Sequence, residues 1–247
     1  MIHLPPLPDY PESKGIDDVI RHAVRDLRVL EEAGVDGVLI ENEYDRPHRV
    51  TASPVTIASM MRVTRAVVQE SENAIIGCEI LLNDPQASLA VAITSGASFI
   101  RTDYFVDAMT RPEYGKFDID PKGLIDYRRK LGVEDVLILA DIQVKYATMI
   151  DPRPLAESAR LACRENADAL VVTGGESGDA PLIDDLREAR SASNVPVLIG
   201  SGFNADNAVD LLAECDGAIV GTALMKDRAV DPVAVELLMS RIGRTPG

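Results

Sequence analysis

Four residues of this sequence could carry proton-transfer or covalent chemistry, and each stands near the end of a short apolar run. A polar side chain in such a place is costly unless it has a partner or a task. A carboxylate can act there as a general base, a histidine can transfer protons, and a lysine can form an imine with a carbonyl or neutralise a phosphate. The predicted catalytic residues are His3, Glu41, Asp141 and Lys145.

A second set of polar residues lies at the ends of the same apolar runs and is predicted to contact a substrate. Arg101 and Asp103 alternate along one run, so their side chains point the same way. They either satisfy each other, or Arg101 binds a carboxylate or phosphate of the substrate through two hydrogen bonds. The predicted substrate-binding residues are Asn42, Glu79, Asn83, Asp84, Arg101 and Asp103.

Structural interpretations of the catalytic candidates stay open beside the functional ones. Lys145 can serve as the ion-pair partner of Asp141, and a lone histidine on an apolar strand, such as His3, is often a hydrogen-bonded core residue. His3 and the strand-end carboxylates could instead hold Mg²⁺ or Mn²⁺ through nitrogen and oxygen ligands, which makes a divalent metal the candidate cofactor. No HxH or HExxH spacing supports such a metal site.

Glycines interrupt the last three apolar runs at the point where each run ends, in the segments TGGESG, GSG and VGT. Glycine lets backbone N–H groups approach phosphate oxygens, and the start of the following helix is electropositive, so such turns bind phosphates without an arginine. The alternative is that these glycines only make tight turns. The predicted phosphate-binding residues are Gly174, Gly175, Gly200, Ser201, Gly202, Gly221 and Thr222.

Eight short apolar runs alternate with longer amphipathic stretches along the whole chain. One such stretch has apolar residues at helical spacing from Ile16 and stops at Gly34, as expected of a helix. The apolar runs are too continuous for a sheet with one solvent-exposed face and are typical of parallel strands covered on both sides. The predicted strands are 1–4, 37–42, 74–81, 99–105, 136–142, 169–174, 195–201 and 217–224.

Eight strand–helix units in 247 residues match the TIM (β/α)₈ barrel in number and length, and we expect one α/β domain over residues 1–247. The competing fold is an open doubly wound sheet, but the first run leads into PPLPDYPESKG, which contains no GxGxxG. In a barrel the carboxyl ends of the strands meet at one face. The irregular segments 41–54 and 107–123 would form active-site loops there.

The chain carries 40 acidic and 25 basic residues and a net charge of −15. This excess argues against nucleic acid or anionic lipid as a partner and leaves a small molecule or another protein. Abundant aspartate and scarce lysine also favour a surface adapted to high salt.

No apolar stretch is long enough for a transmembrane segment and the first residues do not resemble a signal peptide, so we expect a cytoplasmic protein. Whether it forms a homo-oligomer stays open.

Seven segments, in order over nearly the whole chain, resemble the BtpA family. The resemblance implies a TIM barrel of the ribulose-phosphate-binding type, and the family name comes from a proposed role in photosystem I biogenesis. The chain departs from the usual pattern at Asp9, where the family often has glycine, at Glu43, Tyr44 and Asp45, and at Leu82, where it often has arginine. A subfamily with its own substrate is therefore expected. The matching segments are MIHLPPLP, AGVDGVLIEN, LLND, GASFIRTD, ADIQVKYA, ADALVVTGGESG and VLIGSGFNADNAVDLLAECDGAIVGTALMKD.

Together the residues favour an enzyme that acts on a phosphorylated sugar or a similar small phosphate ester. An acid–base pair of Asp141 or Glu41 with Lys145 or His3 would suit isomerisation or epimerisation, and an imine on Lys145 would suit aldol cleavage. The alternative, suggested by the family name, is a non-enzymatic assembly or stability factor for a membrane protein complex. Nucleotide hydrolysis is not favoured, because the chain has no GxxxxGK[ST] segment.

Overall fold

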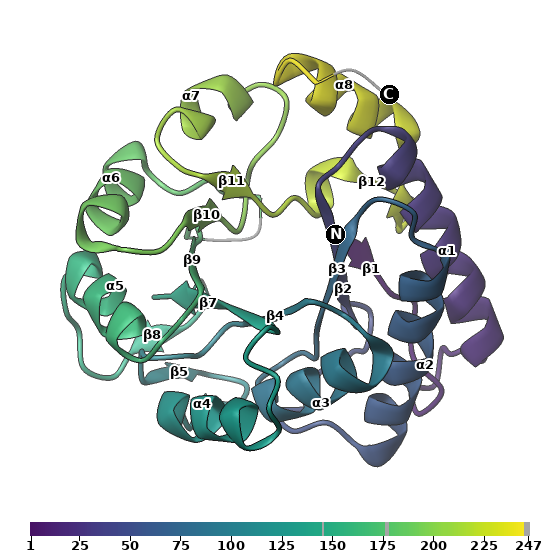
Figure 1. Cartoon of the computed structure of the whole chain (residues 1–247), viewed down its shortest axis with the longest axis horizontal. Helices are drawn as coiled ribbons and strands as arrows, with labels where there is room; N and C mark the ends of the chain where they lie inside the picture. The colour runs from purple at the N-terminus through teal and green to yellow at the C-terminus, as the bar shows by residue number, and fades with distance from the viewer. Residues whose placement is uncertain (145, 176–177, 245–247) are drawn as a thin grey trace. The chain divides into compact units, whose positions relative to one another are not determined.

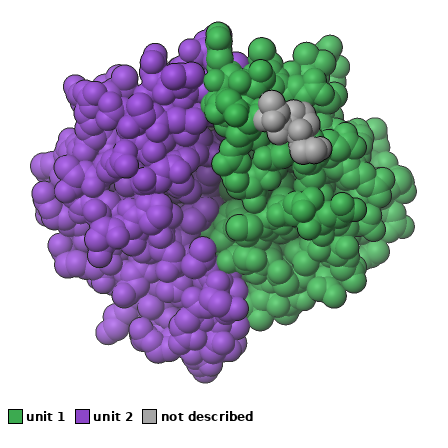
Figure 2. All heavy atoms as spheres, turned by 45° about the horizontal axis from the view of Figure 1, so that its top comes forward, with its two compact units in different colours: residues 1–100, 224–247 green, residues 101–223 purple. Residues whose placement is uncertain are grey.

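A computed structural model of this chain describes residues 1–144, 146–175 and 178–244. The structure divides into two compact units, coloured green and purple in Figure 2. The first unit consists of Met1–Ile100 with Leu224–Gly247, and the second of Arg101–Ala223. Lys145, a predicted catalytic residue, lies outside the described residues.

The first unit is built on parallel strands (Figure 1). Polar residues occupy the carboxyl ends of these strands. The strands pair in the order β1-β2-β3-β4, and the register places His3 beside Glu41 and Glu41 beside Glu79. The elements of this unit are β1 (Ile2–His3), α1 (Ile16–Glu32), β2 (Gly37–Glu41), α2 (Pro54–Glu70), β3 (Ile75–Glu79), α3 (Pro85–Ser95), the start of β4 (Phe99–Thr102), and α8 (Pro232–Arg241).

Strands of this unit are buried on both faces, which explains their continuous apolar sequence. Val38, Leu39 and Ile40 follow one another in β2 and all are buried. Gly77 of β3 lies against the ring of Phe99, and a Cβ on Gly77 would come 2.2 Å from that ring. Glycine is therefore required at this point of the strand, because the neighbouring aromatic ring occupies the space of a side chain.

In the second unit, further parallel strands pair in the order β7-β9-β10-β11, with Asp141 of β7 beside Val171 of β9. Leu198 of β10 lies beside Val171 on one side and Gly217 on the other. The elements are α4 (Pro121–Lys130), β7 (Leu137–Ile142), α5 (Leu155–Arg164), β9 (Ala169–Val172), α6 (Ile183–Ala192), β10 (Val197–Ile199), α7 (Ala208–Leu212) and β11 (Gly217–Ala218), after which a 3₁₀ turn covers Thr222–Leu224.

The long segment 107–123 contains structure of its own in the second unit. Its strands β5 (Met109–Arg111) and β6 (Gly115–Lys116) form a hairpin, and β5 also pairs antiparallel with β8 (Thr148–Met149). The stretches that follow β4 and β7 are thus joined by backbone hydrogen bonds. The end of the predicted loop is helical, because Asp120 caps α4 by accepting a hydrogen bond from Gly123 N–H (2.8 Å).

A small hairpin near the chain end is anchored on α1 by a fully buried carboxylate. It consists of β12 (Met225–Lys226) and β13 (Ala229–Val230). The N–H of Val230 donates to Asp26 Oδ2 (3.3 Å), while Arg25 Nη2 lies 2.7 Å from Asp26 Oδ1. Burial alone would raise the pKa of Asp26, but its interactions with His22 and Arg25 outweigh burial and lower the pKa.

Each of the eight predicted strands contains a strand of the structure, shortened at one or both ends. The amphipathic stretch from Ile16 is helix α1, as predicted. A helix that is both long and apolar enough to cross a membrane is absent from the part of the chain that the structure describes. The prediction of a single domain over residues 1–247 stays a prediction.

Replacing Asp26 with asparagine should lower the free energy of unfolding by about 1–3 kcal/mol, because a buried ionic hydrogen-bond acceptor is weakened. Urea denaturation measures this change. Asp17 is the matched control on the same helix, since its side chain is 78% exposed, and Asp17→Asn should change stability by no more than about 0.5 kcal/mol. Equal effects of the two substitutions would contradict the anchoring role of Asp26.

The stabilisation by Asp26 should also depend on pH. Because folding lowers its pKa below the ordinary value of 3.8, the contribution is complete above that value and is lost as the pH falls through the folded-state pKa. The stability difference between the wild type and Asp26→Asn should therefore shrink on acidification below pH 3.8. A difference that grows on acidification would have the wrong sign for a lowered pKa.

Candidate functional site

A row of buried ionisable side chains crosses the carboxyl ends of β1, β2 and β3 in the first unit. His3, Glu41 and Glu79 occupy paired positions on the three strands and are all buried. His3 Nε2 lies 4.0 Å from Glu41 Oε2. A histidine and a carboxylate this close together can both reach one bound molecule and exchange protons with it, which is the arrangement that acid–base chemistry needs.

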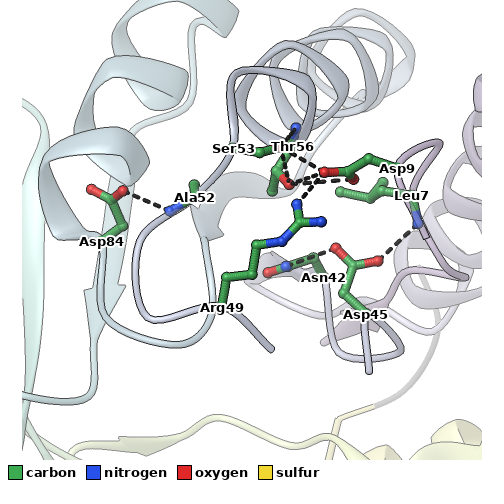
Figure 3. Close-up of polar contacts among 9 residues, drawn as sticks. All are labelled: Leu7, Asp9, Asn42, Asp45, Arg49, Ala52, Ser53, Thr56 and Asp84. Atoms are coloured by element: carbon green, nitrogen blue, oxygen red, sulfur yellow. Dashed lines mark hydrogen bonds and ion pairs between the residues drawn. The ribbon is translucent and has the colours of Figure 1, made fainter. Parts of the chain in front are cut away.

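Asn42, a predicted substrate-binding residue, follows this row and binds to the protein itself (Figure 3). Its Oδ1 accepts a hydrogen bond from Leu81 N–H (2.8 Å), and its Nδ2 donates to Asp45 Oδ2 (3.0 Å). Asp45 Oδ1 accepts from Leu7 N–H (2.8 Å), and burial raises the pKa of Asp45. Asn42 and Asp45 thus hold together the segments that follow β1, β2 and β3.

Asp9, one of the departures from the family pattern, joins the segments that follow β1 and β2 and lies above Asn42 and Asp45 in Figure 3. Its carboxylate accepts from Ser53 Oγ (2.6 Å) and pairs with the Arg49 guanidinium. Burial favours a higher pKa for Asp9, but the hydrogen bonds from Ser53 and Arg49 outweigh burial and lower the pKa. Ser53 in turn caps α2 by accepting a hydrogen bond from Thr56 N–H (3.0 Å).

Asp84 and Asn83 were predicted to bind substrate, and the structure shows contacts of both with their own unit. Asp84 caps α3 by accepting from Ala87 N–H (3.0 Å) and also accepts from Ala52 N–H (3.0 Å) (Figure 3). The backbone N–H of Asn83 donates to Val50 (3.2 Å). Asp84 therefore has a structural role, and its contact with a substrate stays a prediction.

In the second unit, Arg101 and Asp141 form a buried ion pair with two parallel hydrogen bonds. Arg101 Nε donates to Asp141 Oδ1 (2.8 Å) and Nη2 to Asp141 Oδ2 (2.9 Å). The two residues are only 5% and 1% exposed. The alternatives in which Arg101 pairs with Asp103 and Asp141 pairs with Lys145 stay predictions. The planar fork of the guanidinium matches the carboxylate and fixes the orientation of the Asp141 side chain.

The turn directly after Asp141 is fixed by residues that the sequence analysis did not select. Gln143 has a φ of 49°, which is unfavourable for a residue with a side chain. Buried Asp107 stabilises this turn by accepting from Gln143 N–H (2.8 Å) and from Ser158 Oγ (2.6 Å). Gln143 Nε2 also donates to Ser158 Oγ (3.0 Å). Only the position of Asp107 after a predicted strand could have identified it.

The loops after β9 and β10 form a pocket of about 640 Å³ in the second unit. Three of the predicted phosphate-binding glycines, Gly174, Gly175 and Gly202, line it, whereas Gly221 and Thr222 are not among its lining residues. The backbone N–H groups of Gly175 and Gly202 donate no hydrogen bond to any other described residue. The other lining residues are Thr173, Gly178, Asp179, Ala180, Leu182, Asp185, Asn204 and Asn207.

A hydroxyl and two glycines hold these loops together. Gly174 N–H donates to Ser201 Oγ (2.8 Å), and Ser201 Oγ–H donates to the carbonyl of Asp179 (2.9 Å). A Cβ on Gly174 would lie 2.3 Å from the Asp179 carbonyl oxygen, and one on Gly202 would lie 2.1 Å from Ala180 N. Close approach of the two loops therefore requires glycine at position 202, whereas Gly174 is required by a contact within the loop after β9, and the Gly174 N–H is already in use.

The segment between β10 and α7 also shapes the pocket. Asn204 and Asn207 both donate from their side-chain amides to the Gly202 carbonyl (3.2 and 2.9 Å). Asn207 Oδ1 accepts from Asn204 N–H (2.9 Å). Two carboxylates, on Asp179 and Asp185, line the pocket together with these amides. A basic side chain is absent from the described lining, so an anion in the pocket would depend on backbone N–H groups for its binding.

Residues 1–144, 146–175 and 178–244 contain no cluster of ligands for the predicted Mg²⁺ or Mn²⁺ ion. No three His, Cys, Asp or Glu side chains of these ranges come together in a way that could hold an ion. His3 and Glu41 supply two of the side chains that the sequence analysis proposed for such a site. Binding of Mg²⁺ or Mn²⁺ stays a prediction.

Comparison with known proteins confirms the family resemblance. The model of the BtpA family matches residues 1–244 of this chain. A relative from Synechocystis sp., the photosystem I biogenesis protein BtpA, is 32% identical in an alignment of 242 positions that covers 95% of this chain and 84% of that protein. The match therefore spans most of both proteins.

Solved structures with the same fold are enzymes whose names include phosphorylated compounds. Thiamine phosphate pyrophosphorylase from Pyrococcus furiosus is similar with a TM-score of 0.60, 19% identity and 89% of each chain covered. A second similar structure is (S)-3-O-geranylgeranylglyceryl phosphate synthase from Thermoplasma acidophilum, solved with sn-glycerol 1-phosphate. Its TM-score is 0.59 and its sequence identity is 15%, and the match covers 90% of this chain and 87% of that chain. The predicted (β/α)₈ barrel fold class is confirmed.

Replacing Gly202 with alanine should destabilise the protein by about 1–3 kcal/mol, because the new Cβ would collide with the backbone of Ala180 and the φ of 67° disfavours alanine. Gly175→Ala is the matched control, since its Cβ would meet nothing closer than Asp179 Oδ2 at 4.0 Å. In thermal unfolding experiments, only the Gly202→Ala variant should have a lower Tm than the wild type. Unchanged Tm values in both variants would argue against the loop contact.

Proposed function

This chain belongs to the BtpA family, and we propose that it is an enzyme acting on a phosphorylated sugar or a related small phosphate ester. The observation that carries the proposal is the pocket of about 640 Å³ lined by Gly174, Gly175 and Gly202. A phosphate there accepts hydrogen bonds from backbone N–H groups, which glycine leaves accessible. The fold shared with enzymes of phosphorylated compounds supports this choice of ligand.

The pocket sets limits on how the phosphate is held. Its lining carries the carboxylates of Asp179 and Asp185, so bulk electrostatics alone would not attract a dianion. Binding depends on short, directed hydrogen bonds from N–H groups such as those of Gly175 and Gly202. Directed hydrogen bonds to a charged oxygen are about twice as strong as neutral ones, which favours a site of this kind over one built on distant charges.

Two acid–base pairs are candidates for the chemical step. In the first unit, Glu41 can act as the base and His3 as the acid, in agreement with their distance of 4.0 Å. In the second unit, Asp141 can act as the base, with Lys145 as the acid. Both carboxylate oxygens of Asp141 already accept hydrogen bonds from Arg101, so we favour the pair of Glu41 and His3.

The favoured reaction is isomerisation or epimerisation of a phosphorylated ketose or aldose. The base carboxylate removes the proton from the carbon next to the carbonyl, while the acid donates a proton to the carbonyl oxygen. In isomerisation, the protonated base gives its proton to the former carbonyl carbon while the other enediol hydroxyl gives its proton to the deprotonated acid, so both groups return to their starting states. In epimerisation, the enediol hydroxyl returns its proton to the acid, which then protonates the original carbon on its opposite face, and proton exchange with solvent restores both groups. Aldol cleavage through an imine on Lys145 is the other reaction that we keep for this site.

A role as an assembly factor is the second candidate function, because the relative from Synechocystis sp. is named for photosystem I biogenesis. Such a factor would need no pocket for a small phosphate ester. Ligand binding therefore separates the two proposals.

The enzyme proposal predicts that sn-glycerol 1-phosphate and ribose 5-phosphate raise the Tm, whereas glycerol and ribose leave it unchanged. Gly175→Asp should weaken binding of the phosphorylated probes by about tenfold or more, because a carboxylate is added to the pocket lining. Isothermal titration calorimetry in concentrated KCl measures the affinity. Gly175→Ala is the control at the same position and should bind as the wild type does.

Two outcomes would count against the enzyme. If no phosphorylated probe in a broad set of sugar phosphates changes the Tm, the assembly factor is favoured. If Gly175→Asp binds the probes as tightly as Gly175→Ala, the phosphate is not held in this pocket.

A further inference from the structure

The turn of the β12–β13 hairpin places an arginine where the backbone favours glycine. Asp227 and Arg228 have φ values of 51° and 64°, so two consecutive residues with side chains adopt the left-handed conformation. Hairpin turns with this backbone are usually formed by Asn-Gly or Asp-Gly, because a Cβ is unfavourable there. Arg228 occupies the second position, at which glycine would relieve the strain.

The hairpin is held firmly in the first unit, so the place of Arg228 is fixed by the fold. The N–H of Val230 is anchored on the fully buried carboxylate of Asp26 (3.3 Å). The N–H of Asp231 donates to the carbonyl of Leu224 (2.8 Å), which closes the base of the hairpin. Asp231 then caps α8 by accepting from Val233 N–H (3.1 Å). A strained residue on an anchored turn is a candidate for a functional one.

The Arg228 side chain leads toward the buried pair of His3 and Glu41. Its guanidinium lies 4.9 Å from the centre of the Tyr44 ring, and the Tyr44 ring is edge-on to His3 at 6.1 Å. His3 Nε2 lies 4.0 Å from Glu41 Oε2. The Arg228 side chain is 65% exposed, and its Nη1 lies 4.0 Å from Glu12 Oε2. The guanidinium is thus held by the aromatic ring while its N–H groups remain accessible to a ligand.

We propose that Arg228, supported on Tyr44, binds an oxyanion of the ligand close to His3. The ligand group is a phosphate or a carboxylate, both of which match the planar fork of a guanidinium. Stacking on Tyr44 keeps the arginine in place without using its N–H groups. For the identity of the ligand this inference rests on the proposed function, and it adds to that function a second point of anion recognition, in the first unit.

This role explains why an unfavourable residue occupies the turn. Glu12, Glu41 and Glu43 give this part of the first unit a negative potential, which repels an anionic ligand. The positively charged guanidinium of Arg228, held on a rigid turn, makes the local electrostatic potential positive at one point. The anion bound there would lie near the imidazole of His3, where the acid–base chemistry is proposed.

The imidazole resonances of His3 provide a direct reporter of this site. The chain has three histidines, so ¹H–¹⁵N spectra of their side chains can be assigned with a His3→Asn variant. At fixed pH and ionic strength, inorganic phosphate and acetate are titrated in separate experiments. The proposal predicts a saturable shift of His3 with at least one of the two anions, while His22 serves as the internal reference. Which anion binds identifies phosphate or carboxylate as the recognised group.

Two matched variants separate the side chain from the backbone of the turn. Arg228→Gly relieves the strain, so its Tm should equal or exceed that of the wild type, but the anion should bind about tenfold more weakly or not at all. Asp227→Gly relieves the same kind of strain and keeps the arginine, so binding should be equal or tighter.

The outcomes distinguish this inference from the proposed function. Absence of a saturable His3 shift in the wild type, or equal anion affinities of Arg228→Gly and Asp227→Gly, would overturn the role of Arg228. The His3 shift should persist in Gly175→Asp, since that substitution alters the pocket of the second unit. If no sugar phosphate binds that pocket but His3 still responds, the proposed function fails while the Arg228 site stands. Loss of the His3 response in Gly175→Asp would show that the anion acts from the pocket, and the inference would be wrong.

Discussion

The loops after β9 and β10 approach each other so closely that Gly202 has no space for a side chain, because a Cβ there would meet backbone atoms of Asp179 and Ala180. The Ser201 hydroxyl, in the loop after β10, links the two loops by accepting from Gly174 N–H and donating to the Asp179 carbonyl, both in the loop after β9. The pocket exists because this contact brings two stretches of exposed backbone together. The same contact uses the Gly174 N–H, so the capacity to bind an anion rests on the remaining N–H groups of the lining.

Carboxylates carry much of the remaining architecture, which fits a chain with a net charge of −15. Asp9 and Asp84 join loops of the first unit and support helix starts, and buried Asp26 fixes the terminal hairpin on α1. In the second unit, Asp107 stabilises the turn at Gln143. Each carboxylate accepts hydrogen bonds from several donors, and this offsets the cost of burying its charge. Acidic residues near the strand ends therefore have structural tasks as well as the catalytic ones proposed for Glu41 and Asp141.

Much of the fold could be predicted from the sequence, because continuous apolar runs and the glycines at their ends depend on local pattern. The strand ends that carry His3, Glu41 and Asp141 were found in this way. Partners were harder to predict, because pairing depends on distances across the sheet. The pairing of Arg101 with Asp141, forty residues away, is an example. Arg228 was not selected at all, since the strain in its turn and its contact with Tyr44 have no signature in a single sequence.

The central claim is that backbone N–H groups of the β9 and β10 loops bind the phosphate of a small ester. Glycine amide signals lie in a distinct region of the ¹H–¹⁵N spectrum, so titration with sn-glycerol 1-phosphate tests the claim directly. The account predicts saturable shifts of the Gly175 and Gly202 amides with a single affinity, and no such shifts with glycerol. Glycine amides of the pocket that stay unchanged while the ester binds elsewhere would contradict it.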